Sequence, residues 1–132
     1  MTETVSSQLP HVVLCEGYEA LLESLGFVLR DRYRVTSISQ TEALLTLLER
    51  TGPTPALVIL DIDGQPGWYD CLVSLRQAYP NLCVLLLANQ FTLEQQVAAV
   101  QLTDIRFLQK AFSPKQFLEK VETLIQGYSR SP

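Results

Sequence analysis

Two aspartates stand at the end of a continuous apolar run in the middle of the sequence. In ALVILDIDG, residues 56–64, the apolar residues lead directly to Asp61, and Asp63 follows two positions later. A third acidic residue, Glu16, comes directly after the apolar run HVVLC at 11–15. A carboxylate that follows a buried strand lies at the edge of a sheet. There it is either a polar residue of a surface turn or part of a binding or reactive site.

The elements that must position these residues alternate regularly along the chain. Apolar runs at 11–15, 33–38, 56–61, 82–88 and 105–109 predict strands, and an amphipathic stretch after each of them predicts a helix. Three pairs with capping-box spacing predict helix starts: Ser39–Glu42, Thr92–Gln95 and Ser113–Gln116. Pro114 then takes the first helical position of the last helix.

This alternation predicts an α/β fold with a parallel sheet. Right-handed crossovers favour the flavodoxin-like, doubly wound arrangement of five parallel strands in the order 2-1-3-4-5, with helices on both faces. The runs at 33–38, 56–61 and 82–88 do not alternate between apolar and polar residues, which predicts strands that are buried on both faces. We expect one domain at 11–128, between tails at 1–10 and 129–132. Glu16 and Asp61 should meet in a pocket at the carboxyl ends of strands 1 and 3.

Composition narrows the classes of function. Of the 132 residues, 47% are hydrophobic and 18% are charged, which is typical of a globular domain. The net charge of −4 and the lack of a long basic run argue against nucleic acid as a partner. No apolar stretch has membrane-spanning length, and residues 1–10 do not resemble a signal peptide, so we expect no membrane association and a cytoplasmic location. The three cysteines have no metal-ligand spacing.

Other chemical motifs are weaker candidates. His11 precedes the first strand and should lie at the end of the sheet opposite the pocket. The loop DGQPG lacks the lysine and hydroxyl of a phosphate-binding loop, and the sequence has no nucleophile elbow. A cofactor binder on a flavodoxin-like sheet is disfavoured because EGYEA, after the first strand, offers one glycine and two acids. We therefore do not expect an enzyme.

Four segments carry a resemblance to a known family. VVLCEG resembles a first strand with its acidic pair, LVILDID a third strand that ends in a reactive aspartate, Pro66 a proline of the next loop, and LQKAFSPKQFL a fifth strand, turn and last helix. Over residues 11–126 the chain thus resembles the receiver domains of bacterial response regulators. The resemblance implies that Asp61 is the phosphoacceptor and that Lys110 pairs with the phosphoryl group. It also places Glu16 at the first acidic position and Phe107 at the aromatic switch position.

The chain departs from the pattern of that family at three positions. Gly17 stands where the second acidic residue, a direct magnesium ligand, is expected, and Ala88 stands where a hydroxyl contacts the phosphoryl group. Ala111 replaces the proline that follows the lysine. Phosphoryl transfer to a carboxylate needs a divalent cation and a fixed ammonium to hold the developing charge. Loss of supporting groups around a metal ligand lowers metal affinity about 10–100-fold, and loss of a ligand should cost at least as much.

Asp63 has two interpretations. It satisfies backbone amides of the turn, which is the commoner role of a loop aspartate. Alternatively, it replaces the carboxylate that Gly17 lacks, so that Glu16, Asp61 and Asp63 hold Mg²⁺ weakly. Lys110 likewise needs no phosphate, because an ion pair with Asp61 or Glu16 would satisfy its charge.

The resemblance and its departures lead to two functional hypotheses. The first is an atypical, single-domain receiver that acts as a signalling and protein-interaction module, with weak or absent phosphorylation at Asp61. The second is a phosphorylatable receiver that accepts its phosphoryl group from a histidine kinase or phosphotransfer protein. The expected partners are such proteins, an output protein, or a second copy through the face made by the fourth helix, fifth strand and fifth helix. No cofactor besides weakly bound Mg²⁺ is expected.

Overall fold

The computed structural model describes residues 9–50, 52–102 and 104–129 and confirms the predicted architecture. Its five parallel strands are β1 (His11–Cys15), β2 (Arg34–Ile38), β3 (Leu57–Asp61), β4 (Val84–Ala88) and β5 (Ile105–Gln109). The helices are α1 (Glu19–Leu29), the short 3₁₀ helix η2 (Thr41–Ala43), α2 (Leu44–Arg50), α3 (Trp68–Ala78), α4 (Leu93–Val100) and α5 (Pro114–Ser129). The predicted tails fall largely at residues 1–8 and 130–132, outside the described residues.

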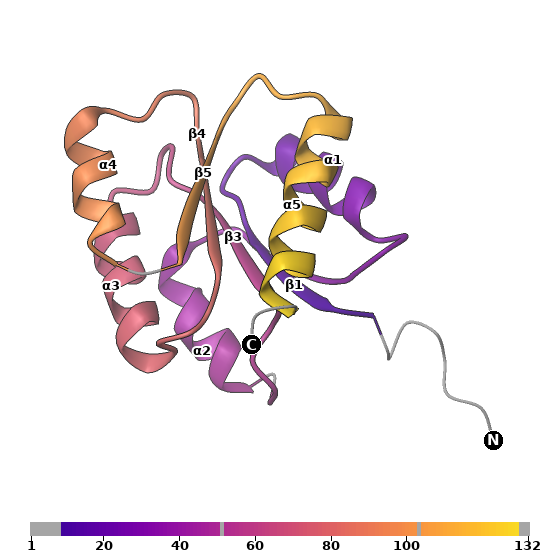
Figure 1. Ribbon diagram of the computed structural model, residues 1–132, viewed down its shortest axis with the longest axis horizontal. Coiled ribbons are helices and arrows are strands. Elements are labelled where there is room, and N and C mark those ends of the chain that lie inside the picture. The colour runs from indigo at the N-terminus through magenta and orange to yellow at the C-terminus, as the bar shows by residue number, and fades with distance from the viewer. Residues whose placement is uncertain (1–8, 51, 103, 130–132) are drawn as a thin grey trace.

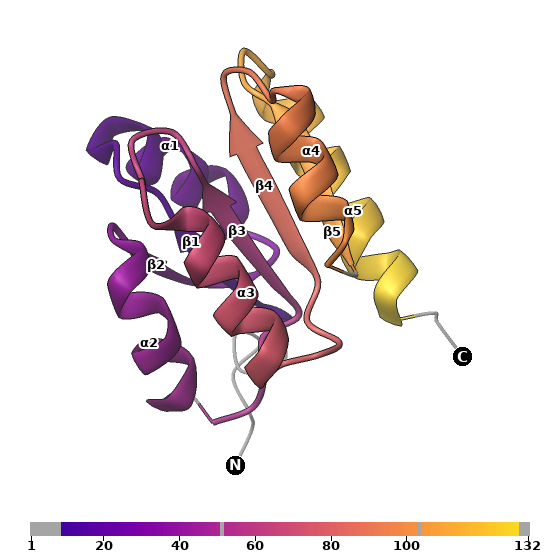
Figure 2. The ribbon, with the colours of Figure 1, turned by 90° about the vertical axis from the view of Figure 1, so that its left-hand side faces the viewer.

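The strand order is β2-β1-β3-β4-β5, as predicted. Helices α1 and α5 cover one face of the sheet, whereas α2, α3 and α4 cover the other (Figures 1 and 2). Within the described part of the chain, no helix is both long and apolar enough to cross a membrane.

Two apolar clusters hold the layers together. One lies under α2, α3 and α4 and includes Leu44, Leu72 and Leu86, and the other lies under α1 and α5 and includes Leu29 and Phe117. All residues of β1, β3 and β4 are buried, because these central strands are covered on both faces and flanked on both sides. The carboxyl ends of β1 and β3 are therefore fixed by the best-packed part of the molecule.

The prediction that the run at 33–38 is buried on both faces was wrong. Strand β2 pairs only with β1, and its residues are partly or fully exposed. The order of the strands places β2 at an edge of the sheet, where fewer neighbours cover its side chains. The runs at 56–61 and 82–88 did form strands buried on both faces.

Two of the three predicted capping boxes are confirmed. Thr92 and Gln95 bond each other's backbone at the start of α4, and Ser113 and Gln116 do the same at the start of α5. The Ser39–Glu42 box was wrong. The chain turns there through η2, whose first flanking residue is Gln40, and no side chain caps it. The 3₁₀ turn moves the start of α2 to Leu44, away from the predicted cap.

Candidate functional site

Strand ends bring Glu16 and Asp61 to the same edge of the sheet. The N–H of Glu16 donates to the carbonyl of Ile38 at 3.0 Å, and the N–H of Ile62, next to Asp61, donates to that of Leu87 at 2.9 Å. These bonds continue the strand ladders past the last strand residues and hold both acids rigidly. Glu16 is 1% exposed and Asp61 is fully buried. Both acids therefore lie where the sequence predicted a pocket.

A tight turn after β3 brings Asp63 back over the end of the strand. The N–H of Gln65 donates to the carbonyl of Ile62 at 3.3 Å, and Gly64 adopts a φ of +71° that a glycine accommodates readily. The N–H of Asp63 donates to Oδ1 of Asp61 at 2.8 Å. The carboxylate of Asp63 accepts a further hydrogen bond from the N–H of Asn89 at 2.8 Å. Asp63 thus satisfies a backbone amide, although that amide belongs to the segment after β4 and not to its own turn.

Lys110 reaches across the edge of the sheet from the end of β5. Its ammonium forms an ion pair with Oδ2 of Asp61 and another with Oδ2 of Asp63, the latter at 2.9 Å. Burial by itself lowers the pKa of Lys110, but the hydrogen bonds with Asp61 and Asp63 and the charge of Asp61 outweigh burial, so the net pKa is raised. Lys110 therefore stays charged, and its ammonium balances the carboxylates of the pocket.

The backbone after Lys110 is strained. Ala111 has a φ of +67°, in the left-handed region that costs a residue with a side chain about 1–2 kcal/mol. The N–H of Lys110 bonds to the carbonyl of Ala88 at 2.7 Å, and the capped α5 begins three residues after Ala111. The chain is therefore held on both sides of Ala111, and it changes direction at this residue. Lys110, directly before this bend, points into the pocket.

Glu16 is a buried acid whose pKa is raised. Oε2 of Glu16 accepts the N–H of Tyr18 at 3.1 Å, whereas no N–H or hydroxyl of the described residues reaches its buried Oε1. Burial, followed by a hydrogen bond with Asp61, raises the pKa of Glu16 to about 8. Glu16 therefore keeps its proton to higher pH than an exposed glutamate does, which reduces the negative charge of the pocket.

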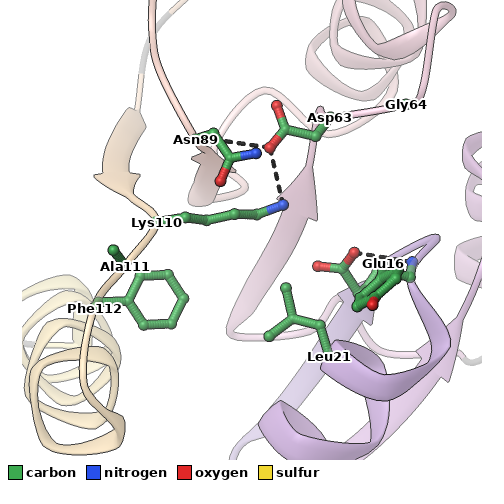
Figure 3. A pocket seen from close by; sticks show the side chains of 9 residues that line it. Glu16, Leu21, Asp63, Gly64, Asn89, Lys110, Ala111 and Phe112 are labelled. Atoms are coloured by element: carbon green, nitrogen blue, oxygen red, sulfur yellow. Dashed lines mark hydrogen bonds and ion pairs between the residues drawn. The ribbon is translucent and has the colours of Figure 1, made fainter.

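The site opens into a pocket of about 660 Å³ (Figure 3). Its lining residues are Glu16, Tyr18, Leu21, Asp63, Gly64, Asn89, Lys110, Ala111 and Phe112. In Figure 3, Asp63 and Asn89 lie on one side of the Lys110 ammonium and Glu16 lies across from it. Leu21 and Phe112 form an apolar wall beside these ionic groups.

Gln65 is a residue of the site that the sequence analysis missed. A Cβ atom on Gly17 would lie 3.1 Å from Nε2 of Gln65, which in turn donates to the carbonyl of Ser39 at 3.2 Å. The Gln65 side chain is buried and fills the space beside Gly17. Only the tertiary fold brings positions 17, 39 and 65 together, so no local sequence signal pointed to this contact. The Gln65 side chain thus occupies the space that a side chain at position 17 would need.

The residues of the pocket do not fit a magnesium site of the kind receiver domains need. Gly17 offers no oxygen, and the nearest side-chain group to it is the amide nitrogen of Gln65, which is not a metal ligand. Asp63, the predicted replacement, directs Oδ2 to Lys110 and Asn89. Glu16 and Asp61 supply the remaining carboxylates of the pocket, and the ammonium of Lys110 already contacts Asp61.

Ala88 and Phe107, two further positions singled out by the resemblance, lie on β4 and β5. Ala88 is fully buried at the end of β4 and has no hydroxyl to present. Phe107 is half-buried, packs against the apolar cluster under α2, α3 and α4, and meets the ring of Phe91 edge-on at 5.0 Å between centroids. His11, by contrast, lies at the other end of the sheet, where its Nε2 bonds the hydroxyl of Thr36 at 2.8 Å.

Solved structures share this fold. A CheY-like response regulator receiver domain protein from Methanospirillum hungatei superposes with a TM-score of 0.81 at 19% identity, covering 92% of this chain and 98% of that one. A response regulator receiver protein from Sinorhizobium medicae gives 0.78 at 22% identity, covering 93% and 99%. The beryllofluoride-activated DrrB receiver domain gives 0.75 at 18% identity, covering 89% and 98%. No protein-family model matches the sequence, and no curated protein matches it. The chain therefore has the fold of response-regulator receiver domains.

Proposed function

We propose that this chain is an atypical receiver, a signalling and protein-interaction module of a bacterial two-component-type pathway in which phosphorylation at Asp61 is weak or absent. The observation that carries the proposal is the state of the pocket. Lys110 is paired with both Asp61 and Asp63, burial raises the pKa of Glu16, and the Gln65 side chain fills the space beside Gly17. These contacts balance the charge of the site without a metal ion and without a phosphoryl group.

The shared fold supports a role in protein recognition. Receiver domains work with histidine kinases, phosphotransfer proteins and output proteins, and these are the partner classes that we propose here. Self-association through the face formed by α4, β5 and α5 is a further form of the same function. Phe107 of β5 packs against the ring of Phe91, and we propose that this contact helps to fix the shape of the face.

The experiment is a titration with Mg²⁺ followed by beryllofluoride, which mimics a phosphoryl group on an aspartate. Trp68, which begins α3 after the loop that follows Asp61, supplies a fluorescence signal, and amide shifts supply a second. We expect no saturable response of the unaltered protein at millimolar Mg²⁺.

A matched variant with Gly17→Asp and Gln65→Ala serves as the positive control, because it restores a carboxylate and the room for it. A Mg²⁺-dependent beryllofluoride response of the unaltered protein that disappears in Asp61→Asn would replace this proposal with the phosphorylatable receiver.

A further inference from the structure

Asp63 links three separate parts of the pocket. Its N–H donates to Oδ1 of Asp61 at 2.8 Å, at the end of β3. Its Oδ2 accepts the N–H of Asn89 at 2.8 Å, after β4, and the ammonium of Lys110 at 2.9 Å, after β5. A single carboxylate therefore ties together the chain segments that follow three neighbouring strands (Figure 3).

A phosphoryl group on Asp61 would need the groups that Asp63 already occupies. Lys110 is the cation that contacts Oδ2 of Asp61, so an oxyanion attached there would lie against the same ammonium. Phosphoryl oxygens also accept hydrogen bonds from backbone N–H groups that point into a site, and the N–H of Asn89 is such a group. A carboxylate and a phosphoryl oxygen compete for these donors because both are anionic acceptors.

We propose that Asp63 is a built-in anion that takes the place of a phosphoryl group and holds the segment 89–92 against the pocket in the unmodified protein. The proposal rests on the proposed function and deepens it, because it names the residue that fixes the shape of the module. In this structure the carboxylate of Asp63 is directed to Lys110 and to an amide that follows β4, and not to the amides of its own turn.

The effect of Asp63 extends to the surface beside α4 through a short path. Asn89, held by Asp63, is two residues from Phe91, and the ring of Phe91 packs edge-on against Phe107 of β5. Thr92, the next residue, caps α4 together with Gln95. The bond between Asp63 and Asn89 therefore anchors one end of the segment whose other end starts α4. Ala88 has no hydroxyl that could anchor this segment. The carboxylate of Asp63 anchors it instead, through the N–H of Asn89.

The test compares amide hydrogen exchange at Asn89, together with the ring signals of Phe91 and Phe107, in single variants of the whole chain. Asp63→Ala should speed exchange at Asn89 at least tenfold and shift both ring signals. Asp70→Ala is the matched control, because Asp70 is an exposed aspartate in the first turn of α3 and its loss changes the net charge equally. Asp70→Ala should change exchange at Asn89 less than twofold.

Circular dichroism establishes that each variant is folded, and Asp63 lies in a loop with its side chain 34% exposed, so folding should survive its loss. Unchanged exchange and unchanged rings in folded Asp63→Ala would overturn the inference. Equal effects of Asp70→Ala and Asp63→Ala would also overturn it, because net charge alone would then explain them. A response of the unaltered protein to beryllofluoride contradicts the proposed function instead, so the two failures are distinguishable.

Discussion

Asp61 is fully buried, and its negative charge is compatible with burial because the ammonium of Lys110 contacts it. Lys110→Ala would leave this carboxylate without its cation. Breaking a buried ion pair from one side costs about 3–5 kcal/mol, so we expect a loss of that order in the free energy of unfolding, measured with urea. Lys115→Ala, at an exposed lysine in the first turn of α5, should change it by less than about 0.5 kcal/mol. Equal losses in the two variants would contradict the buried pair.

The proton on Glu16 makes stability depend on pH. The pKa of Glu16 is raised from 4.5 to about 8 in the folded protein. Since the folded state keeps this proton to higher pH than the unfolded chain, the contribution of Glu16 is complete below about pH 4.5 and is lost as the pH rises toward 8. Urea unfolding of the unaltered protein and of Glu16→Gln, which resembles the protonated acid, should show this. Relative to the variant, the unaltered protein should lose stability between pH 5 and 8.

A flat difference between the two proteins over that range, or a difference that favours the unaltered protein at higher pH, would contradict the raised pKa of Glu16.

Gln65 determines what happens when an acid is restored at position 17. Gly17→Asp alone should restore little Mg²⁺ affinity, because its Cβ would lie 3.1 Å from the Gln65 amide. Gly17→Asp combined with Gln65→Ala should bind Mg²⁺ at least about tenfold more tightly than the single variant, the lower end of the effect of supporting groups around metal ligands. Isothermal titration calorimetry measures both affinities. Equal affinities would mean that Gln65 does not obstruct the site.

The unaltered protein gives the baseline of the same titration, and we expect no saturable binding at millimolar Mg²⁺. Tight Mg²⁺ binding by the unaltered protein that Asp63→Ala abolishes would assign Asp63 to the metal.

At the scale of elements, the two serines predicted as helix caps differ in their contacts. Ser113 caps α5 through the N–H of Gln116 at 3.0 Å, whereas the side chain of Ser39 caps no helix. Ser113→Ala should therefore lower the free energy of unfolding by about 1 kcal/mol, the usual effect of losing a cap. Ser39→Ala is the matched control and should change it by less than about 0.5 kcal/mol, as for an ordinary surface substitution. A larger loss from Ser39→Ala than from Ser113→Ala, in thermal or urea unfolding, would reverse this assignment.

At the scale of the whole molecule, we expect the face formed by α4, β5 and α5 to be fixed and not switched. Ala88 offers no hydroxyl, so the position of Phe107 should not depend on the state of Asp61. Asp61→Asn should leave affinity for a partner or a second copy nearly unchanged. Arg106→Glu, at an exposed position of β5, should weaken it. Surface plasmon resonance or sedimentation measures these affinities. A tenfold effect of Asp61→Asn, about 1.4 kcal/mol, would favour a phosphorylation-dependent switch.

The layers of the fold and the acids of the site could be predicted from the order of apolar and amphipathic segments. Apolar runs such as 56–61 and 82–88 were long and uninterrupted enough to identify central strands, and the order of strands and helices then limited the topology. Glu16 and Asp61 followed from this, because residues at the carboxyl ends of neighbouring parallel strands must meet. The caps at Thr92 and Ser113 were also predictable, since a capping box involves only four consecutive residues.

How the pocket balances its charges could not be predicted, because it depends on contacts between distant segments. The contact of Gln65 with Gly17, the bond from Asn89 to Asp63 and the double pairing of Lys110 join residues that are tens of positions apart. The exposure of β2 likewise depends on its place at the edge of the sheet, and the failed cap at Ser39 depends on the 3₁₀ turn at η2. Local patterns report the backbone and the burial of a segment, whereas the partner of a side chain is set by which other segments the fold brings within hydrogen-bond distance.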